Sequence, residues 1–181
     1  MGWRNSGQGW GRTARLLHWL SALILVTLLA VGFIMTELKP SPQTIKIYTA
    51  HKSFGLLLLA IVLVRILWRG VDRKPPELPM PAWQRWLAQG VHLGLYGLMI
   101  ALPVTGWLMH SASGYPLKWF FVGPAVPALI AKDSGAKHLF EEWHEALAWG
   151  LIVLLILHVA GALKHHFIDR DRTLMRMLKG Q

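Results

Sequence analysis

The sequence is organised around residues 143–166, WHEALAWGLIVLLILHVAGALKHH. Residues 146–163 within it carry no charged side chain, and that length suits a helix crossing a membrane. His144 and His158 lie near its two ends. Because they are fourteen residues apart, a helix places them on one stripe, about 21 Å apart along its axis. Ionisable side chains inside a membrane are costly and mark function, so we expect a helix with one redox-centre ligand near each membrane face.

The composition indicates a membrane protein. Of 181 residues, 54% are hydrophobic and 15% charged, which is too apolar for a soluble domain of this size. The absence of cysteine excludes disulfides, thiolate-bound iron–sulfur clusters and covalently attached c-type haem. The net charge of +10 does not indicate a nucleic-acid partner, because the basic residues flank apolar runs, as membrane-orientation signals do.

Long apolar runs predict four membrane spans, at about residues 15–36, 48–68, 86–110 and 144–166. We therefore expect an all-α fold, a bundle of four transmembrane helices forming a single domain over residues 1–181. The first run is long for a signal peptide and is followed by no small-residue cleavage site, so we interpret it as a retained span. Residues 111–142 are predicted to be a loop, whose aromatic and proline content suggests that it lies on the membrane surface.

The basic residues predict which side each connection faces. Thirteen of the nineteen lysines and arginines, including every arginine, fall in the N-terminal segment, around the second connection and in the C-terminal tail. Cytoplasmic segments of membrane proteins are enriched in these residues. The sequence therefore predicts that both termini are cytoplasmic.

Depth in the membrane sorts four histidines into two pairs. His18 and His158 fall near the inner face, whereas His51 and His144 fall near the outer face. Two imidazoles that face each other at one depth suit six-coordinate haem iron. A small residue follows each histidine by one turn, at Ala22, Gly55, Ala148 and Ala162. Such residues leave flat helix surface for a porphyrin, although close helix packing uses them as well.

Other residues compete for these roles or could assist them. His92 and His110 lie near the inner and outer ends of the third span and share one helix face. Either could replace a ligand of the pair at its depth, and spacing leaves this open. Arg65 lies on the stripe of His51 at the inner face, where it could contact a haem propionate or serve only as an orientation charge.

Four segments resemble the bacterial diheme cytochrome b-561 family, within the group of nickel–iron hydrogenase cytochrome b subunits. They are RLLHWLSA (15–22), IYTAHKSFGLLLLAIVLVRILWR (47–69), VHLGLYGLMIALPVTGW (91–107) and WHEALAWGLIVLLILHVAGALKHHFIDRDRTLMRM (143–177). The resemblance implies a four-helix bundle in the bacterial inner membrane that holds two non-covalent b haems. It also implies iron ligands on the first, second and fourth helices, namely His18, His51, His144 and His158, and so decides against His92 and His110.

The resemblance further implies a protein in membrane lipid that moves electrons between a quinone and a donor on the outer side. The leading expectation is a superoxide:ubiquinone oxidoreductase, with superoxide oxidised outside. We expect the quinone site at the inner face beside His165, seven residues after His158 on the same stripe. Two alternatives are an electron-relay anchor for a separate periplasmic redox enzyme and a haem-free metal transporter or packing protein.

Overall fold

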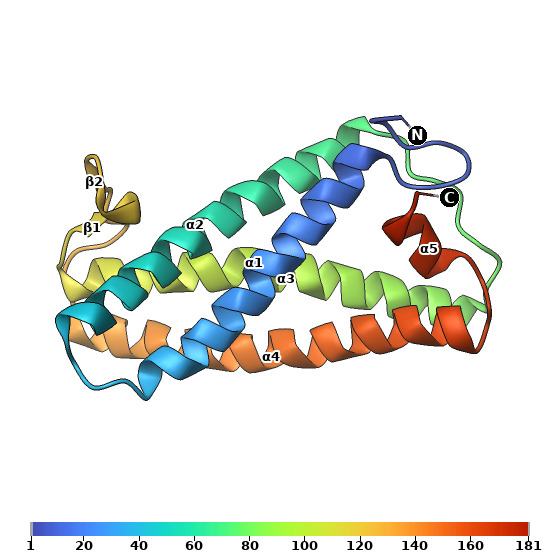
Figure 1. Cartoon of the computed structure of the whole chain (residues 1–181). Coiled ribbons are helices and arrows are strands. Elements are labelled where there is room, and N and C mark those ends of the chain that lie inside the picture. Colours follow the sequence, from blue (N-terminus) through green and yellow to red (C-terminus); the bar gives the residue numbers. More distant parts are fainter. Residues whose placement is uncertain (1, 181) are drawn as a thin grey trace. The chain divides into compact units, whose positions relative to one another are not determined.

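The computed structural model describes residues 2–180, and these residues are mostly helical. The helices are α1 (Arg12–Thr36), α2 (Pro42–Val71), α3 (Ala82–Ser113), α4 (Ser134–Phe167) and the short α5 (Thr173–Leu178) (Figure 1). Within the described residues, α1, α2, α3 and α4 are the four helices long and apolar enough to cross a membrane. The mostly helical fold and the four apolar helices predicted from the sequence are confirmed.

Each long helix extends beyond the apolar run that predicted it, and α4 does so most clearly. It begins at Ser134, so the prediction of a loop up to residue 142 is wrong at its end. Asp133 Oδ1 accepts the backbone N–H groups of Gly135 and Ala136 at 2.8 and 3.0 Å, which caps the helix. The first turns are polar and include an exposed Lys137–Glu141 ion pair of 3.2 Å, so hydropathy gave no sign of them.

The connection between α3 and α4 contains a small antiparallel hairpin. Strand β1 (Leu117–Lys118) pairs with β2 (Ala125–Val126), and the 3-10 helix η1 (Trp119–Phe121) lies between them. Trp119 Nε1 donates to the Ser53 carbonyl at 3.1 Å, and the Phe120 N–H donates to Ser53 Oγ at 3.0 Å. These bonds fasten the connection to α2. Its location on the membrane surface stays a prediction.

The described residues divide into two compact units. Unit 1 comprises residues 2–22, 61–97 and 151–180, and unit 2 comprises residues 23–60 and 98–150. The expectation of a single domain over residues 1–181 stays a prediction. His18 and His158 belong to unit 1, whereas His51 and His144 belong to unit 2.

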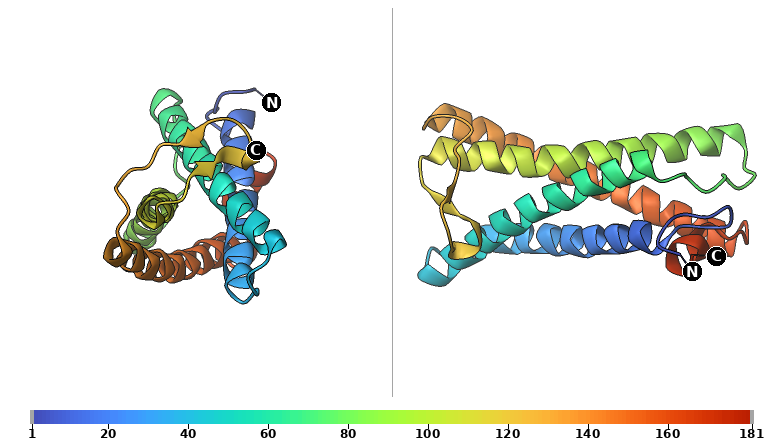
Figure 2. Two further views of the ribbon diagram at one scale, coloured as in Figure 1. Left: turned by 90° about the vertical axis from the view of Figure 1, so that its left-hand side faces the viewer. Right: turned by 90° about the horizontal axis from the view of Figure 1, so that it is seen from above.

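In unit 1, α5 contacts the N-terminal segment and the connection between α2 and α3 (Figures 1 and 2). Arg176 is buried, donating from Nε to the Gln8 carbonyl at 2.6 Å and from Nη1 to the Pro76 carbonyl at 2.8 Å. Arg15 Nη2 donates to the Leu178 carbonyl at 2.6 Å. Charged hydrogen bonds of this length are strong. These three segments of unit 1 therefore lie together.

The helices bury few side chains and expose many large apolar ones. Leu23, Leu67 and Ile156 are more than 60% exposed, as expected of surfaces that face lipid. The most buried positions include Ser21 and Ser53, whose hydroxyls donate to the carbonyls of His18 and Thr49 at 2.9 and 2.8 Å. Small hydrogen-bonded residues of this kind allow membrane helices to approach each other closely.

Candidate functional site

In unit 1, the structure brings together the two histidines that the depth argument paired. The rings of His18 on α1 and His158 on α4 have centroids 6.2 Å apart. An iron bound by two imidazole nitrogens at about 2.0 Å each sets the ring centroids about 6 Å apart. The separation in unit 1 therefore fits one iron between the two rings.

Unit 2 contains a second pair with nearly the same separation. The rings of His51 on α2 and His144 on α4 have centroids 6.5 Å apart. Both rings are close to glycines: a Cβ at Gly106 would lie 3.2 Å from His144 Cε1, and a Cβ at Gly32 would lie 3.4 Å from His51 Cε1. Larger residues would crowd the imidazoles, so these glycines leave them space.

A threonine on α3 determines the tautomer of His144. Thr105 Oγ1 donates its single proton to the Leu102 carbonyl at 2.9 Å and also lies 3.1 Å from His144 Nδ1. Since the hydroxyl proton is already used, Nδ1 carries a hydrogen and donates to Thr105. The lone pair of His144 is then on Nε2, where an iron can accept it. The sequence analysis missed this bond, because no spacing rule links positions on two different helices.

His110 has a different partner in unit 2. Its Nδ1 lies 3.0 Å from Lys52 Nζ. An ammonium group can only donate, so this ring nitrogen accepts. In unit 2, therefore, His51 and His144 lie together, whereas His110 contacts Lys52. The contact between His110 and Lys52 was not predicted from the sequence.

Unit 1 contains a third imidazole beside the pair. The ring of His92 on α3 lies 5.3 Å from that of His158, centroid to centroid. His158 is thus close to both His18 and His92. The choice of His18 over His92 as iron ligand stays a prediction.

Arg65 contacts the His18 imidazole directly. Its Nη2 lies 2.8 Å from His18 Nδ1, its Nη1 donates to Ser21 Oγ at 3.2 Å, and its guanidinium stacks on the Tyr96 ring at 5.1 Å. Because a guanidinium only donates, His18 Nδ1 accepts and Nε2 carries the hydrogen in this arrangement. If His18 held an iron through Nε2, that hydrogen would have to move to Nδ1, and Arg65 would then need another acceptor. Tyr96 is a contact that the sequence analysis missed.

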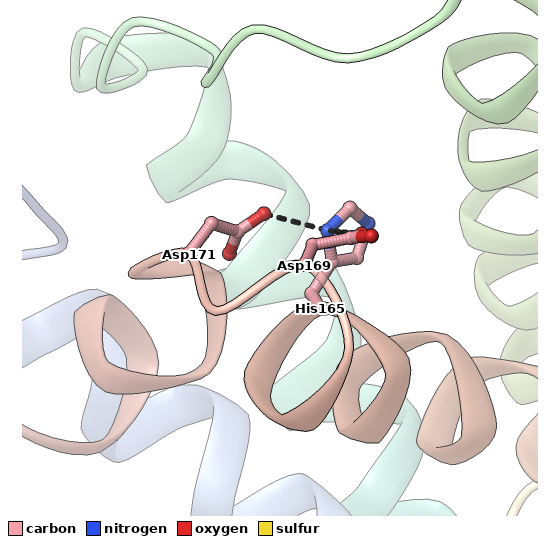
Figure 3. Close-up of side chains that lie close together, drawn as sticks. All are labelled: His165, Asp169 and Asp171. Carbon is pink, nitrogen blue, oxygen red and sulfur yellow. Dashed lines mark hydrogen bonds and ion pairs between the residues drawn. The ribbon is translucent and has the colours of Figure 1, made fainter.

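His165 lies at the end of α4 between two carboxylates (Figure 3). Its Nδ1 is 2.7 Å from Asp171 Oδ2 and 3.1 Å from Asp169 Oδ2, and Lys164 Nζ is 2.7 Å from the same Asp169 oxygen. Partial burial favours a raised pKa for Asp171, but hydrogen bonds from Thr173 and His165 outweigh it and lower that pKa. The sequence analysis singled out His165 and missed both aspartates.

Together these residues fit a b-type haem, which is held only by histidine ligands and burial. Each unit offers two neighbouring imidazoles at a suitable separation, and the contact of His144 with Thr105 favours the required tautomer. A Cβ added at Gly55 or Gly161 would meet no atom of the described chain within 4 Å, so the flanks of these histidine-bearing helices are open.

Comparison with known proteins identifies the family. A family model described as prokaryotic cytochrome b561 matches residues 9–180. The chain belongs to the prokaryotic cytochrome b561 family. Membrane electron transfer through b-type haem is the property of this family, so the haem-free alternative is set aside.

Several curated members of the cytochrome b561 group are similar over nearly the full chain. Cytochrome b561 homolog 2 of Escherichia coli K12 is 39% identical, with 98% of this chain and 95% of the relative covered. The probable superoxide oxidase CybB of Yersinia pestis is 28% identical, with 90% and 91% covered. A probable Ni/Fe-hydrogenase 1 B-type cytochrome subunit of Escherichia coli K12 is 23% identical, with 92% and 86% covered. These relatives support a redox function and leave the electron donor of this cytochrome b561 to be proposed.

Proposed function

We propose that this cytochrome b561 binds two b haems and carries electrons across the bacterial inner membrane from superoxide to ubiquinone. His18 and His158 would hold one haem, and His51 and His144 would hold the other. The observation that carries the proposal is the presence of two such pairs, with centroid separations of 6.2 and 6.5 Å. Bound haem supplies one-electron chemistry, and the protein sets its position and potential.

The chain's own residues have distinct roles at the two sites. Thr105 accepts the Nδ1 hydrogen of His144 and holds Nε2 toward the iron position. Arg65, which contacts His18 at 2.8 Å, would be a charge-matched partner for a haem propionate. His144 and His158 lie on one helix, about 21 Å apart along its axis, so each haem would be close to one face of the membrane.

Contacts within unit 1 support an orientation with both termini in the cytoplasm. Arg176 bonds to Gln8 and Pro76, so the N-terminal segment, the second connection and the tail lie on one side. These segments and the adjoining helix ends contain every arginine, and arginine-rich segments stay cytoplasmic. Under this proposal the end of unit 1 that contains these segments faces the cytoplasm, and the quinone site lies there, beside His165.

The choice of superoxide as donor is supported by similarity to the probable superoxide oxidase of Yersinia pestis. The test is purified protein supplied with enzymatically generated superoxide and a water-soluble ubiquinone analogue. We expect faster superoxide loss with matching quinol formation, and loss of both in His51→Ala. His138→Ala is the matched control, because its exposed ring pairs only with Glu142 among the contacts of the described chain. Superoxide decay that is unchanged by the protein would refute this donor.

A second candidate is an electron-relay subunit for a separate redox enzyme. It is favoured by similarity to the hydrogenase B-type cytochrome subunit of Escherichia coli K12, at the lower identity of 23%. Under this proposal the haems are reduced by a partner protein and not by superoxide. Mild-detergent purification from the native membrane distinguishes the two, because a relay subunit copurifies with a redox enzyme that reduces its haems.

A further inference from the structure

The His165 imidazole is held by one nitrogen, and this fixes where it can exchange a proton. Asp171 has a lowered pKa and is therefore a carboxylate, which can only accept hydrogen bonds. Since His165 Nδ1 lies 2.7 Å from Asp171 Oδ2, that nitrogen must be the donor. The other ring nitrogen, Nε2, is then the atom available to a ligand.

Asp171 is itself fixed by the backbone. Its second oxygen, Oδ1, accepts the N–H of Thr173 at 2.7 Å at the start of α5. Its side chain is 23% exposed and that of His165 is 14% exposed, so water competes little for the bond. Asp171 therefore connects α5 to the His165 ring and holds the ring in one orientation (Figure 3).

We propose that Asp171 is a positioning residue for His165, fixing its tautomer and orientation so that Nε2 delivers protons to a quinone reduced at this site. The proposal rests on the proposed function, because it takes the quinone site to lie beside His165. It adds a specific role for Asp171 and a specific atom, Nε2, as the proton donor. A carboxylate that orients an imidazole in this way is a general device of acid–base catalysis.

Reduction of the quinone needs two electrons and two protons, and the proposed function supplies the electrons through haem. Bound haem would supply two electrons to the quinone, one at a time, and would be oxidised from the ferrous to the ferric state. Before each protonation, water on the inner side adds a proton to Nε2, so that both ring nitrogens carry a hydrogen. The Nε2–H bond then breaks as an O–H bond forms on a quinone oxygen, and the ring returns to the neutral form with its hydrogen on Nδ1. Two electrons and two protons convert one quinone to one quinol.

The other charged groups around His165 favour this role over a metal site. The three potential ligand atoms of His165, Asp169 and Asp171 lie within 4.8 Å of one another, as a cation would require. However, Lys164 Nζ lies 2.7 Å from Asp169 Oδ2, the oxygen that faces the ring. A fixed ammonium at that oxygen repels a divalent cation. A proton-delivering imidazole is compatible with the same arrangement.

The test compares Asp171→Asn, Asp171→Glu, His165→Ala and the Asp171→Asn/His165→Ala double variant in the haem-loaded protein. An exposed acid of unit 1, Glu77, supplies the matched control Glu77→Gln. We expect Asp171→Asn to lower the kcat for ubiquinone-analogue reduction about 10- to 100-fold with little change in KM. Asp171→Glu should restore most of the rate, and haem reduction by the donor should be unchanged in every variant.

A spectroscopic signature separates positioning from folding. In the ferrous, diamagnetic protein, the 15N shifts of His165 should show hydrogen on Nδ1 in the native chain and on Nε2 in Asp171→Asn. The double variant should be no slower than His165→Ala, because the two residues act as one unit. A double variant slower than His165→Ala, or an unchanged tautomer in Asp171→Asn, would overturn the proposal.

The results separate two possible failures: a wrong quinone site, and a wrong role for Asp171 at a correct quinone site. If His165→Ala reduces quinone normally, the quinone site is wrong and the role of Asp171 falls with it. If His165→Ala is impaired while Asp171→Asn matches the native chain, only the role of Asp171 is refuted. If chelation of divalent cations slows the native chain as much as Asp171→Asn does, the cluster is a cation site and the proposal is overturned.

Discussion

Thr105 Oγ1 and His144 Nδ1 lie 3.1 Å apart, and the threonine hydroxyl proton is already donated to the Leu102 carbonyl. The imidazole is therefore the donor in this bond. A histidine that donates from Nδ1 is a more basic iron ligand through Nε2, and this favours ferric iron. The contact links α3, which supplies none of the proposed iron ligands, to His144, a proposed ligand of one haem.

Replacing Thr105 by valine should raise the midpoint potential of one haem. A hydrogen bond contributes about 1 kcal/mol, which corresponds to about 40 mV for one electron. Thr105→Ser keeps the hydroxyl, so its midpoint potential should stay close to that of the native chain. Spectroelectrochemical titration measures both variants, and equal potentials in Thr105→Val and the native chain would show that the contact does not affect the haem.

Removing the charge of Arg65 should lower the potential of the other haem. A unit charge about 8 Å from a redox centre changes the free energy of reduction by about 2 kcal/mol at an effective dielectric constant of about 20. That energy corresponds to a shift of about 100 mV in the midpoint potential. Arg65→Gln should therefore shift the titration downward and Arg65→Lys much less. Arg85→Gln is the control, since Arg85 is exposed and paired with Glu77. A shift of the same size in Arg85→Gln would mean that the effect is not local.

Gly106 and Gly97 on α3 offer a matched pair of alanine substitutions. A Cβ at Gly106 would lie 3.2 Å from His144 Cε1, whereas a Cβ at Gly97 would meet no atom of the described chain within 4 Å. Gly106→Ala should displace the ring and lower the stability of the haem-loaded protein by about 1–3 kcal/mol. Gly97→Ala should be neutral or slightly stabilising, because alanine is the better helix former. Thermal unfolding monitored by haem absorbance compares them, and similar midpoints would argue against crowding of His144.

Arg176 is predicted to hold α5 against the rest of unit 1. Arg176→Ala leaves the carbonyls of Gln8 and Pro76 without this donor, a cost of about 1–3 kcal/mol. We expect faster proteolysis of the C-terminal segment from residue 168 onward. Arg172→Ala, at an exposed neighbour, is the control and should leave the cleavage rate unchanged. Equal cleavage of both variants and the native chain would contradict this role.

The sequence predicted those features that depend on local pattern. Apolar runs located α1 to α4, and the fourteen-residue spacing of His144 and His158 predicted two sites along α4. Depth paired His18 with His158 and His51 with His144, and the structure brings both pairs together. The polar start of α4 was missed, because helix capping by Asp133 leaves no hydropathy signal.

Contacts that depend on helix rotation could not be predicted. Thr105 meets His144, Lys52 meets His110 and Arg65 meets Tyr96 only because of how neighbouring helices turn toward each other. A sequence fixes which residues share a face of one helix, and packing between helices decides which faces meet. The same limit explains why spacing could not separate His18 from His92, and the structure places both beside His158.

The haem content of the purified chain and its histidine variants tests the central claim most directly. A pyridine haemochrome assay should give two b haems per native chain and one for each of His18→Ala, His51→Ala, His144→Ala and His158→Ala. His92→Ala and His110→Ala should retain both. One haem or none in the native chain would contradict the account, as would loss of a haem in His92→Ala with both retained in His18→Ala.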